Sequence, residues 1–246
     1  MSIEKMLDHR TIREFTKDEV PKEVIATLKS VVNRAPTWMG MQAYSIISVK
    51  DEGVRREILD ISKQEYLVRC PELWIFVADL HRNMEIMKEK SGEAKGLDMD
   101  RFIHGFSDAM IAAQQLTVAA EELGLGCVYF GSVVNDYGKL SKILKLPKGA
   151  FPVVGVGFGY PNQKPQIKPR MSIDLKFFED TYKVEENYMA KIKDYDEEMT
   201  TYYDTRDEGR RSDCFSDQIV SKYGKRVFER DQILKVIRDQ GFDLKI

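Results

Sequence analysis

Two short basic clusters, far apart in the chain, carry residue types that bind phosphate groups. His9-Arg10-Thr11-Ile12-Arg13 lies near the N-terminus, and Lys168-Pro169-Arg170 lies far downstream. Guanidinium and ammonium groups form charge-assisted hydrogen bonds with phosphate oxygens, so two such clusters could hold one phosphate from two sides. A single basic run is more commonly a solvated surface. Whether the two clusters form a phosphate site or a charged surface therefore has to be judged from the rest of the sequence.

No other set of side chains offers an obvious reactive group. The three histidines, His9, His81 and His104, are dispersed and do not form a metal-binding set. Cys70 and Cys127 lie beside or within apolar segments, which favours packing over nucleophilic chemistry. We therefore predict no catalytic side chain and no metal ligand. An enzyme without reactive side chains usually depends on a bound cofactor.

Composition and charge narrow the class of protein. The 246 residues can form one sizeable core, or a core with an appendage. The hydrophobic fraction of 43% and the charged fraction of 32% are typical of a globular protein with a hydrated surface. A net charge of -2 argues against a general nucleic-acid binder, which usually has a basic face. The basic clusters therefore suit a small anion better than a polyanion.

The chain shows no signal for export or membrane insertion. Its first residues, MSIEKMLDHR, lack an apolar segment, and no apolar run approaches the roughly 20 residues of a membrane span. The three cysteines include no CxxC pair, which argues against a disulfide framework or a structural zinc site and favours a reducing compartment. We expect a cytoplasmic protein whose partners include neither nucleic acid nor a membrane.

The first 160 residues alternate between helix and strand patterns. Apolar residues spaced by three and four predict helices, and short apolar runs predict strands. Segment 73–78 is apolar at nearly every position, which suits a strand buried on both faces. The predicted helices cover about 22–35, 53–63 and 101–123, and the predicted strands cover 44–49, 73–78 and 153–158.

The helix over 101–123 is the most distinctive of these elements. It is apolar nearly all round, so we expect it to be buried. Its alanines permit close helix approach, and the sequence leaves open whether it forms the centre of a core or half of a dimer interface. Gly124 ends the helix as a C-cap. In the segment that follows, Gly131 could present its backbone N–H to a ligand.

The glycines of segment 153–159 have a structural interpretation. Gly155, Gly157 and Gly159 alternate, so in a strand they share one face and permit close packing. They do not form a dinucleotide fingerprint, because Pro161 follows where a helix should begin.

The composition changes after Tyr160. Residues 160–182 are proline-rich and extended, and residues 185–246 contain polar helical segments with few large apolar residues. We predict a core over 1–160 and, within the same domain, an extension over 161–246 that wraps the core or a second subunit. The helices predicted in this tail cover 185–203, 216–222 and 230–240.

An ordered set of motifs resembles a known family. HRTIREF, APTWMGMQAYSIISV, DAMIAAQQLTVAAEELGLGCVYFGS, PVVGVGFGYP, KPR and YYDTRDEGRRSDCFSDQI occur in the order found in the FMN-dependent nitroreductase family. The set is most similar to the larger, oxygen-insensitive, NADPH-preferring branch, which includes flavin reductases. The resemblance covers essentially the whole chain.

The resemblance implies a fold and an activity. The fold would be α+β, with a central, mostly antiparallel sheet flanked by helices, in a domain-swapped-like homodimer whose C-terminal extension wraps its partner. The flavin would lie at the subunit interface. Family chemistry is ping-pong: NADPH or NADH transfers hydride to flavin N5 and leaves, and a small-molecule electron acceptor then enters the same site.

The resemblance also implies roles for individual residues. His9, Arg10, Lys168 and Arg170 would surround the phosphate and ribityl end of FMN. Arg13 would lie near the flavin N1/O2 edge, where a fixed cation stabilises the negative charge that reduction places there. Gln64 would contact the pyrimidine edge, and Phe130 to Ser132 would pass under N5. The full set implied to bind FMN is His9, Arg10, Thr11, Arg13, Thr37, Gln64, Tyr129, Phe130, Gly131, Ser132, Lys168 and Arg170.

Some positions depart from the family pattern or have two interpretations. Thr37 replaces a common serine and keeps a hydroxyl, whereas Trp38 could either stack over the flavin or pack within the protein. Val134 stands where some members have an arginine. Arg206, Arg210 and Arg211 match a segment associated with the 2′-phosphate of NADPH, or they form a charged loop offset by neighbouring acidic residues.

Three functions therefore stay open. The first is an FMN-dependent NAD(P)H oxidoreductase that reduces nitroaromatics, quinones or free flavin. The second is a non-catalytic flavin-binding carrier or sensor. The third is a phosphate-anion module without flavin, for which the two basic clusters would suffice and the apolar helix would be superfluous.

Overall fold

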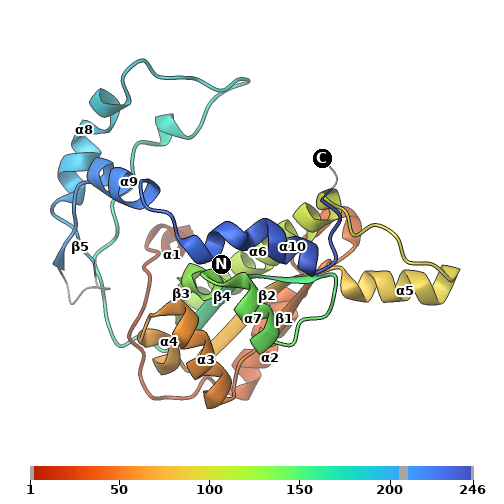
Figure 1. The fold of residues 1–246 in the computed structure, drawn as a ribbon. Helices are drawn as coiled ribbons and strands as arrows, with labels where there is room; N and C mark the ends of the chain where they lie inside the picture. The colour runs from red at the N-terminus through yellow and green to blue at the C-terminus, as the bar shows by residue number, and fades with distance from the viewer. Residues whose placement is uncertain (1–2, 205–209, 245–246) are drawn as a thin grey trace. The chain divides into compact units, whose positions relative to one another are not determined.

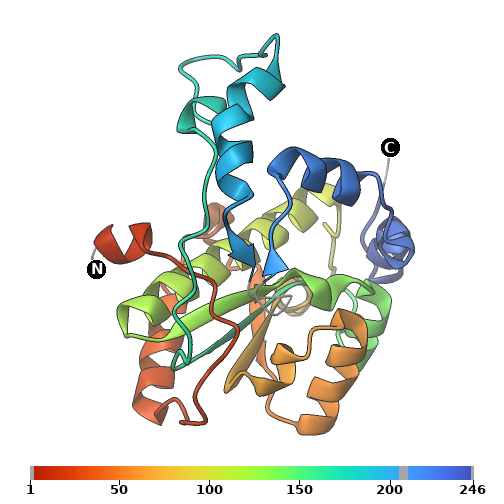
Figure 2. The ribbon, with the colours of Figure 1, turned by 90° about the vertical axis from the view of Figure 1, so that its left-hand side faces the viewer.

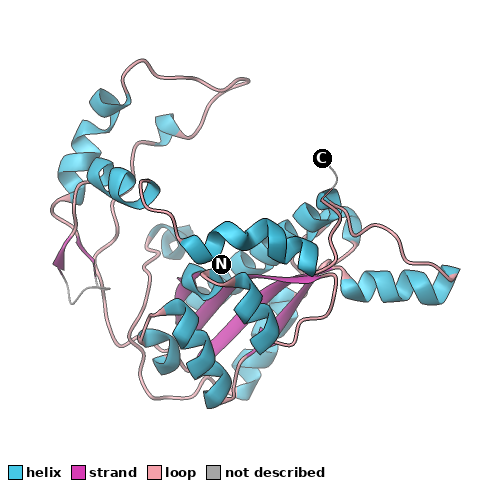
Figure 3. Ribbon diagram, viewed as in Figure 1, coloured by secondary structure: helices cyan, strands magenta, loops and turns pink. Residues whose placement is uncertain are grey.

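A four-stranded antiparallel sheet forms the core of the larger of two compact units. A computed structural model describes residues 3–204 and 210–244. The strand order is β1-β2-β4-β3, and every neighbouring pair is antiparallel, as Figure 3 shows in magenta. This sheet confirms the α+β class and the mostly antiparallel arrangement. The strands are β1 (Tyr44–Ser48), β2 (Glu72–Asp79), β3 (Gly126–Phe130) and β4 (Ala150–Gly159).

The two central strands are buried on both faces. All ten residues of β4 and all of β2 except Asp79 are buried, which confirms the prediction for segment 73–78. Glycines allow this close packing. A Cβ atom on Gly157 would lie 2.7 Å from the Phe130 ring and 2.9 Å from the sulfur of Cys70. The glycines of β4 therefore serve packing.

Helices cover both faces of the sheet. The side chains of Trp74, Phe76 and Ala78 pack with α2 (Lys22–Val32) and α6 (Met99–Glu122). Alternate residues of the same strand pack against α3 (Glu52–Ser62), α4 (Tyr66–Arg69) and α7 (Tyr137–Ile143) on the other face. Figure 2 shows the sheet between α2 and α6 on one side and the orange α3 on the other.

The long helix α6 is only partly buried. One face is packed in the core, with Ala109, Ala113 and Leu116 fully buried. The other face leaves Ile103, Met110 and Ile111 exposed at 55%, 38% and 38%. In the single chain α6 is thus buried on one face, and whether its other face is half of a dimer interface stays a prediction. The described residues of this unit leave that apolar face uncovered.

The remaining elements are short. Segment 230–240, predicted as one helix, is a 3-10 turn, η5 (Phe228–Gln232), followed by α10 (Ile233–Asp239). None of the helices in the described part of the chain is long and apolar enough to cross a membrane. The other elements are α1 (Ile3–Leu7), α5 (His81–Ser91), α8 (Tyr188–Met199), α9 (Phe215–Tyr223), η1 (Trp38–Gly40), η2 (Gly131–Val134), η3 (Ile173–Leu175), β5 (Tyr203–Asp204) and β6 (Arg210–Arg211), and Figure 1 labels most of the helices and strands.

The chain divides into two compact units. One comprises Met1–Gln163 and Val227–Ile246, and the other comprises Lys164–Arg226. In the first unit, Ile237 and Phe242 are buried in the core beside α6. In the second unit, the backbone N–H and the hydroxyl of Ser216 donate to the carboxylate of Asp196, at 2.8 and 2.5 Å, which joins α9 to α8. The domain boundary predicted at residue 160 stays a prediction.

Candidate functional site

The N-terminal basic cluster lies along the edge strand β3. Thr11 forms a parallel bridge with Cys127, and the Ile12 amide donates to the Cys127 carbonyl at 2.9 Å. The approach is close because a Cβ atom on Gly126 would lie 2.5 Å from the Ile12 side chain. The glycine at the start of β3 thus permits the N-terminal segment to add to the sheet edge and fixes the position of the basic cluster.

Two carboxylates accompany this cluster. His9 Nδ1 lies 2.6 Å from Glu121 Oε1 at the end of α6, and Arg10 donates to Asp8 at 2.6 Å. The histidine is therefore held against the helix that precedes β3. Glu121 is a contact that the sequence did not predict, because 112 residues separate it from His9.

Tyr66 joins three of the predicted site residues. The guanidinium carbon of Arg13 lies 5.9 Å from the centroid of its ring, a cation–π distance. The Tyr66 hydroxyl donates to Gln64 Oε1 at 2.6 Å, and its ring stacks on Phe130 with centroids 5.3 Å apart. The structure thus brings Arg13, Gln64 and Phe130 together. Tyr66 was not predicted as a site residue, although it lies only two positions after Gln64 in the sequence.

The turn after β3 has open space at Gly131 and an unsatisfied hydroxyl beside it. A Cβ atom on Gly131 would meet no atom within 4 Å. Ser132 Oγ is buried and has no hydrogen-bond partner among the described residues, which is unfavourable unless a bound group supplies one. The space at Gly131 and the Ser132 hydroxyl leave room and a hydrogen-bonding group for a bound ligand.

Arg230 supports this turn from the C-terminal segment. Its guanidinium donates to the Gly131 carbonyl at 2.9 Å and to Asn135 Oδ1 at 2.7 Å. These bonds join positions about a hundred residues apart. Sequence analysis did not single out Arg230, because nothing local to η5 distinguishes it from a surface arginine.

The hydroxyl of Tyr129 is engaged within the chain. It donates to Gln114 Oε1 at 3.1 Å and lies 3.2 Å from Thr117 Oγ1. Burial raises the pKa of this phenol. The side chain therefore points toward α6, and any contact of Tyr129 with FMN stays a prediction.

Thr37 belongs to a different network. Its hydroxyl lies 3.4 Å from the Gln42 amide, across the loop 37–42. The next residue, Trp38, stacks on His104 with centroids 4.5 Å apart and planes 11° apart. Trp38 thus contacts another side chain while half of its surface stays exposed, and whether it also stacks over the flavin stays a prediction. The role of Thr37 toward a cofactor stays a prediction.

A cavity of about 1020 Å³ lies beside this loop. It is lined by the loop, by β1 and by α5, with mostly apolar and aromatic side chains. The charged groups among its lining residues are all basic: Lys29, Arg82, Lys90, Lys95 and Arg101. The chemistry of this lining suits a flat apolar ligand, and its charge favours an anion.

The second basic cluster lies in the second unit. Arg170 Nη1 donates to the carbonyls of Lys168 and Pro169, at 2.9 and 3.2 Å, and Lys168 Nζ lies 5.9 Å from the Tyr202 ring centroid. We predicted that this cluster and the N-terminal cluster bind the same phosphate. The two clusters belong to different units, and this stays a prediction. Arg210 and Arg211 form strand β6, and Arg206 lies outside the described residues.

The cysteines behave as packing residues. Cys70 and Cys127 are buried. Burial raises the pKa of the Cys70 thiol to about 12 and raises that of Cys127 as well. Both stay protonated at neutral pH and are therefore poor nucleophiles, as the sequence indicated.

Sequence comparison finds one family along nearly the whole chain. The model described as Nitroreductase family matches residues 6–73 and 71–160, and the model described as Nitroreductase family, C-terminal domain, matches residues 168–245. An FMN reductase (NADPH) of Bacillus subtilis (strain 168) is 32% identical over 98% of each chain. An NADPH-dependent oxidoreductase of Staphylococcus aureus (strain USA300) is 32% identical over 95% of this chain and 94% of its own.

Solved structures give the same result. The hypothetical oxidoreductase YcnD from Bacillus subtilis superposes with a TM-score of 0.92 at 28% identity, covering 100% of both chains. The NADPH:FMN oxidoreductase from Vibrio harveyi, complexed with NAD+, superposes with a TM-score of 0.87 at 27% identity, covering 99% of both chains.

Proposed function

The chain belongs to the nitroreductase family, and from that membership we propose that it reduces nitroaromatics, quinones or free flavin. It is an NADPH-dependent oxidoreductase with FMN as its cofactor. When bound, FMN would supply the hydride-transfer chemistry between NADPH and an acceptor. The donor and the acceptor use the same site in turn, as in a ping-pong reaction.

The residues around Gly131 fit such a cofactor. The observation that carries the proposal is the cluster in which Tyr66 joins Arg13, Gln64 and Phe130. It offers a cation, an amide and the ring of Tyr66, which the buried Phe130 ring supports, and these groups suit a flat ring with a polar edge. The open space at Gly131 and the unsatisfied Ser132 hydroxyl support the same site.

Each group has a distinct task in this proposal. Arg13 supplies fixed positive charge close to the polar edge of the ring, which makes negative charge there less costly. Gln64, oriented by Tyr66, provides amide hydrogen bonds. The backbone N–H of Gly131 and the hydroxyl of Ser132 would donate hydrogen bonds to the cofactor. His9, Arg10, Lys168 and Arg170 bind the phosphate, with Thr11, Thr37 and Tyr129 completing the set.

Colour and redox response test the proposal. The purified protein should be yellow, and its flavin absorbance should bleach when NADPH is added without oxygen. Adding a nitroaromatic, a quinone or free flavin should restore the absorbance. A colourless protein that fails to bind added FMN contradicts the proposal. A yellow protein that fails to oxidise NADPH with every acceptor favours the carrier or sensor instead.

We also propose that the protein is a homodimer. The support is the apolar face of α6, where Ile103, Met110 and Ile111 are exposed in the single chain. Light scattering should give twice the chain mass, and an FMN-replete, active monomer would contradict the proposal. We further propose a cytoplasmic location, with which the free cysteines Cys70, Cys127 and Cys214 are consistent.

The arginines of the tail are proposed to select NADPH. Arg206, Arg210 and Arg211 would bind its 2′-phosphate, which NADH lacks. Replacing all three with alanine should raise the KM for NADPH and leave that for NADH unchanged. An equal rise in the KM for NADPH and in the KM for NADH would contradict this role.

A further inference from the structure

The guanidinium group of Arg230 holds the turn after β3 at two points. Its Nη2 donates to the Gly131 carbonyl at 2.9 Å and to Asn135 Oδ1 at 2.7 Å, and its Nε donates to the same Asn135 oxygen at 3.1 Å. Two nitrogens of one rigid, planar group therefore bind both the backbone of the turn and a side chain beside it. Arg230 and both acceptors belong to the larger compact unit.

Asn135 is itself held by two further hydrogen bonds. Its backbone N–H donates to the Ser132 carbonyl at 3.0 Å, and its Nδ2 donates to the Ile61 carbonyl at 3.4 Å. The side-chain amide thus uses its oxygen for Arg230 and its NH2 group for a carbonyl of α3, which fixes its orientation. The arginine therefore binds a partner that is already in place.

The C-terminal segment that carries Arg230 is anchored independently of this contact. Arg230 lies in η5, and α10 follows directly. Ile237 of α10 and Phe242 after it are buried in the core, with 3% and 1% of their surfaces exposed. Arg230 itself is exposed. Replacing it should therefore leave the core intact, so its contact with the turn can be tested without unfolding the protein.

The geometry of the peptide bond connects Arg230 to the backbone N–H of Ser132. In a planar trans peptide, the C=O of one residue and the N–H of the next point in opposite directions. Because Arg230 fixes the Gly131 carbonyl, it also fixes the Ser132 N–H, which points away from the arginine. A charge-assisted hydrogen bond to the carbonyl also polarises the peptide and makes its N–H a stronger donor.

The same turn has room for a ligand that could accept this hydrogen bond. A Cβ atom on Gly131 would meet no heavy atom within 4 Å. Ser132 Oγ is buried and has no hydrogen-bond partner among the described residues. Open space, a hydroxyl group and an oriented backbone donor are therefore combined within two consecutive residues.

We propose that Arg230 is a positioning residue that orients and polarises the Gly131–Ser132 peptide, so that the Ser132 N–H donates to the bound flavin. The flavin part of this inference rests on the proposed function, whereas the orientation of the peptide does not. A donor that is aligned before the cofactor binds requires no reorganisation when reduction adds negative charge to the ring. Arg230 therefore stabilises the reduced cofactor relative to the oxidised one, and it does so through the peptide.

The principal test measures the flavin midpoint potential in Arg230→Gln, in Asn135→Ala and in the double variant. In Arg230→Gln the affinity for reduced relative to oxidised flavin should fall roughly tenfold, which lowers the potential by about 30 mV for a two-electron couple. Asn135→Ala changes no charge but removes one anchor of the guanidinium, so it should lower the potential by a smaller amount. Since both changes act through one contact, the double variant should match Arg230→Gln.

Arg238→Gln is the matched control for the lost charge. Arg238 is an exposed arginine of α10 in the same C-terminal segment, and its replacement should leave the potential unchanged. An unchanged potential in Arg230→Gln would overturn the proposal. A lower potential in Arg230→Gln with an unchanged potential in Asn135→Ala would also overturn it, because the lost charge alone would then explain the effect. A lower Tm at an unchanged potential would show a purely structural role.

Amide NMR separates this inference from the proposed function. In protein labelled with 15N, the Ser132 amide resonance should shift in Arg230→Gln and stay unchanged in Arg238→Gln. Asn135→Ala should shift the same resonance, which keeps the inference testable if Arg230→Gln does not fold. An unmoved Ser132 resonance in both variants would overturn the positioning role. If the unaltered protein binds no FMN, the proposed function fails, and this resonance still decides whether Arg230 orients the peptide.

Discussion

The guanidinium carbon of Arg13 lies 5.9 Å from the centroid of the Tyr66 ring, which makes the second arginine of the N-terminal cluster part of an aromatic site. The same ring stacks on Phe130 and donates a hydrogen bond to Gln64. A charged residue that the sequence could also assign to a solvated surface is thus placed beside aromatic faces. This placement supports the proposal that Arg13 lies near the ring of FMN rather than near its phosphate.

Replacing Arg13 with alanine should therefore impair flavin reduction more than FMN retention. Loss of the cation should lower the flavin midpoint potential, on the order of 30 mV for a two-electron couple. Spectroelectrochemical titration measures the potential, and Arg13→Lys, which keeps the charge, is the matched control. Equal potentials in Arg13→Ala and the unaltered protein would contradict the role.

Arg170→Ala should show the reverse pattern. Its guanidinium lies in the second basic cluster, where it donates to the backbone of Lys168 and Pro169. If the cluster binds the phosphate, the Kd for FMN should rise roughly tenfold while the potential of the bound flavin stays within a few millivolts. Calorimetric titration of FMN into the apoprotein gives the Kd. An unchanged Kd would show that this cluster does not bind the phosphate.

The hydroxyl of Tyr66 provides a finer test of the site. Tyr66→Phe removes the 2.6 Å bond to Gln64 and keeps the ring that stacks on Phe130. A hydrogen bond of this kind contributes about 1 kcal/mol, so the Kd for FMN should rise about fivefold. The Tm of the Tyr66→Phe apoprotein should stay close to that of the unaltered apoprotein. A large loss of stability without a change in Kd would indicate a purely structural role.

Gly131→Ala should separate folding from cofactor binding. Since a Cβ atom there meets nothing within 4 Å, the apoprotein should be as stable as the unaltered protein, within about 0.5 kcal/mol. The methyl group would enter the space proposed for FMN, so the Kd should rise at least tenfold. Gly138→Ala is the control, because its Cβ atom would make only ordinary contacts, at 3.5 Å. Normal FMN affinity in Gly131→Ala would place the flavin elsewhere.

The sequence predicts strands β1, β2 and β4 and the helix α6 because their apolar patterns are strong, whereas the edge strand β3 is not among the predicted strands. Segment 73–78 is apolar throughout, and the structure places it at the centre of the sheet. By contrast, α5 was not predicted. None of its residues is buried, so it has no apolar stripe from which periodicity could be read.

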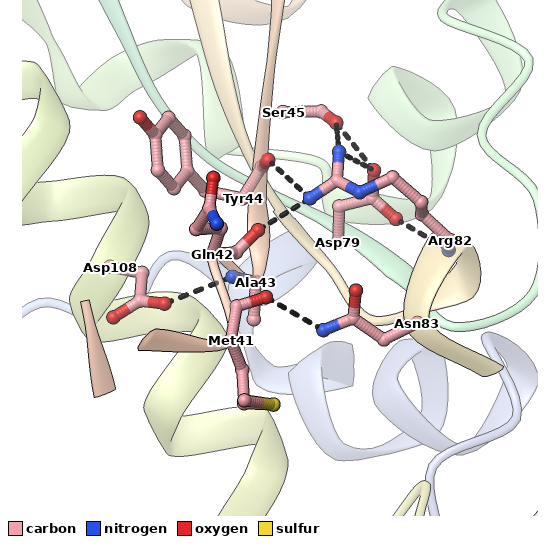
Figure 4. A network of polar contacts seen from close by, with 9 residues as sticks. All are labelled: Met41, Gln42, Ala43, Tyr44, Ser45, Asp79, Arg82, Asn83 and Asp108. Atoms are coloured by element: carbon pink, nitrogen blue, oxygen red, sulfur yellow. Dashed lines mark hydrogen bonds and ion pairs between the residues drawn. The ribbon is translucent and has the colours of Figure 1, made fainter. Parts of the chain in front are cut away.

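Residues of the candidate site could be predicted only where their residue type or the family resemblance indicated a role. Arg13 and Gln64 were named through the family resemblance, and the structure joins them through Tyr66. The hydrogen bonds that Asp108 accepts from the amides of Trp38 and Ala43 could not be predicted, because these residues lie 70 and 65 positions away in the sequence; Figure 4 shows the bond to Ala43. A carboxylate within an apolar helix gives no local indication of which distant amides it binds. Contacts of this kind appear only once the fold is known.

The buried thiol of Cys70 predicts how stability depends on pH. Burial raises its pKa from 9.0 to about 12 in the folded protein. Above pH 9 the unfolded chain releases this proton while the folded chain retains it, so the folded state binds more protons and stability falls as the pH rises. The free energy of unfolding should therefore decrease between pH 8.5 and 9.5, by at most about 1.4 kcal/mol per pH unit for each such thiol. Cys127 acts in the same direction, since burial raises its pKa also.

Urea unfolding between pH 8.5 and 9.5 measures how the free energy of unfolding changes with pH, and Cys70→Ala should reduce this change. Stability that rises with pH over this range in the unaltered protein would mean that the thiol ionises more easily folded than unfolded, against its burial.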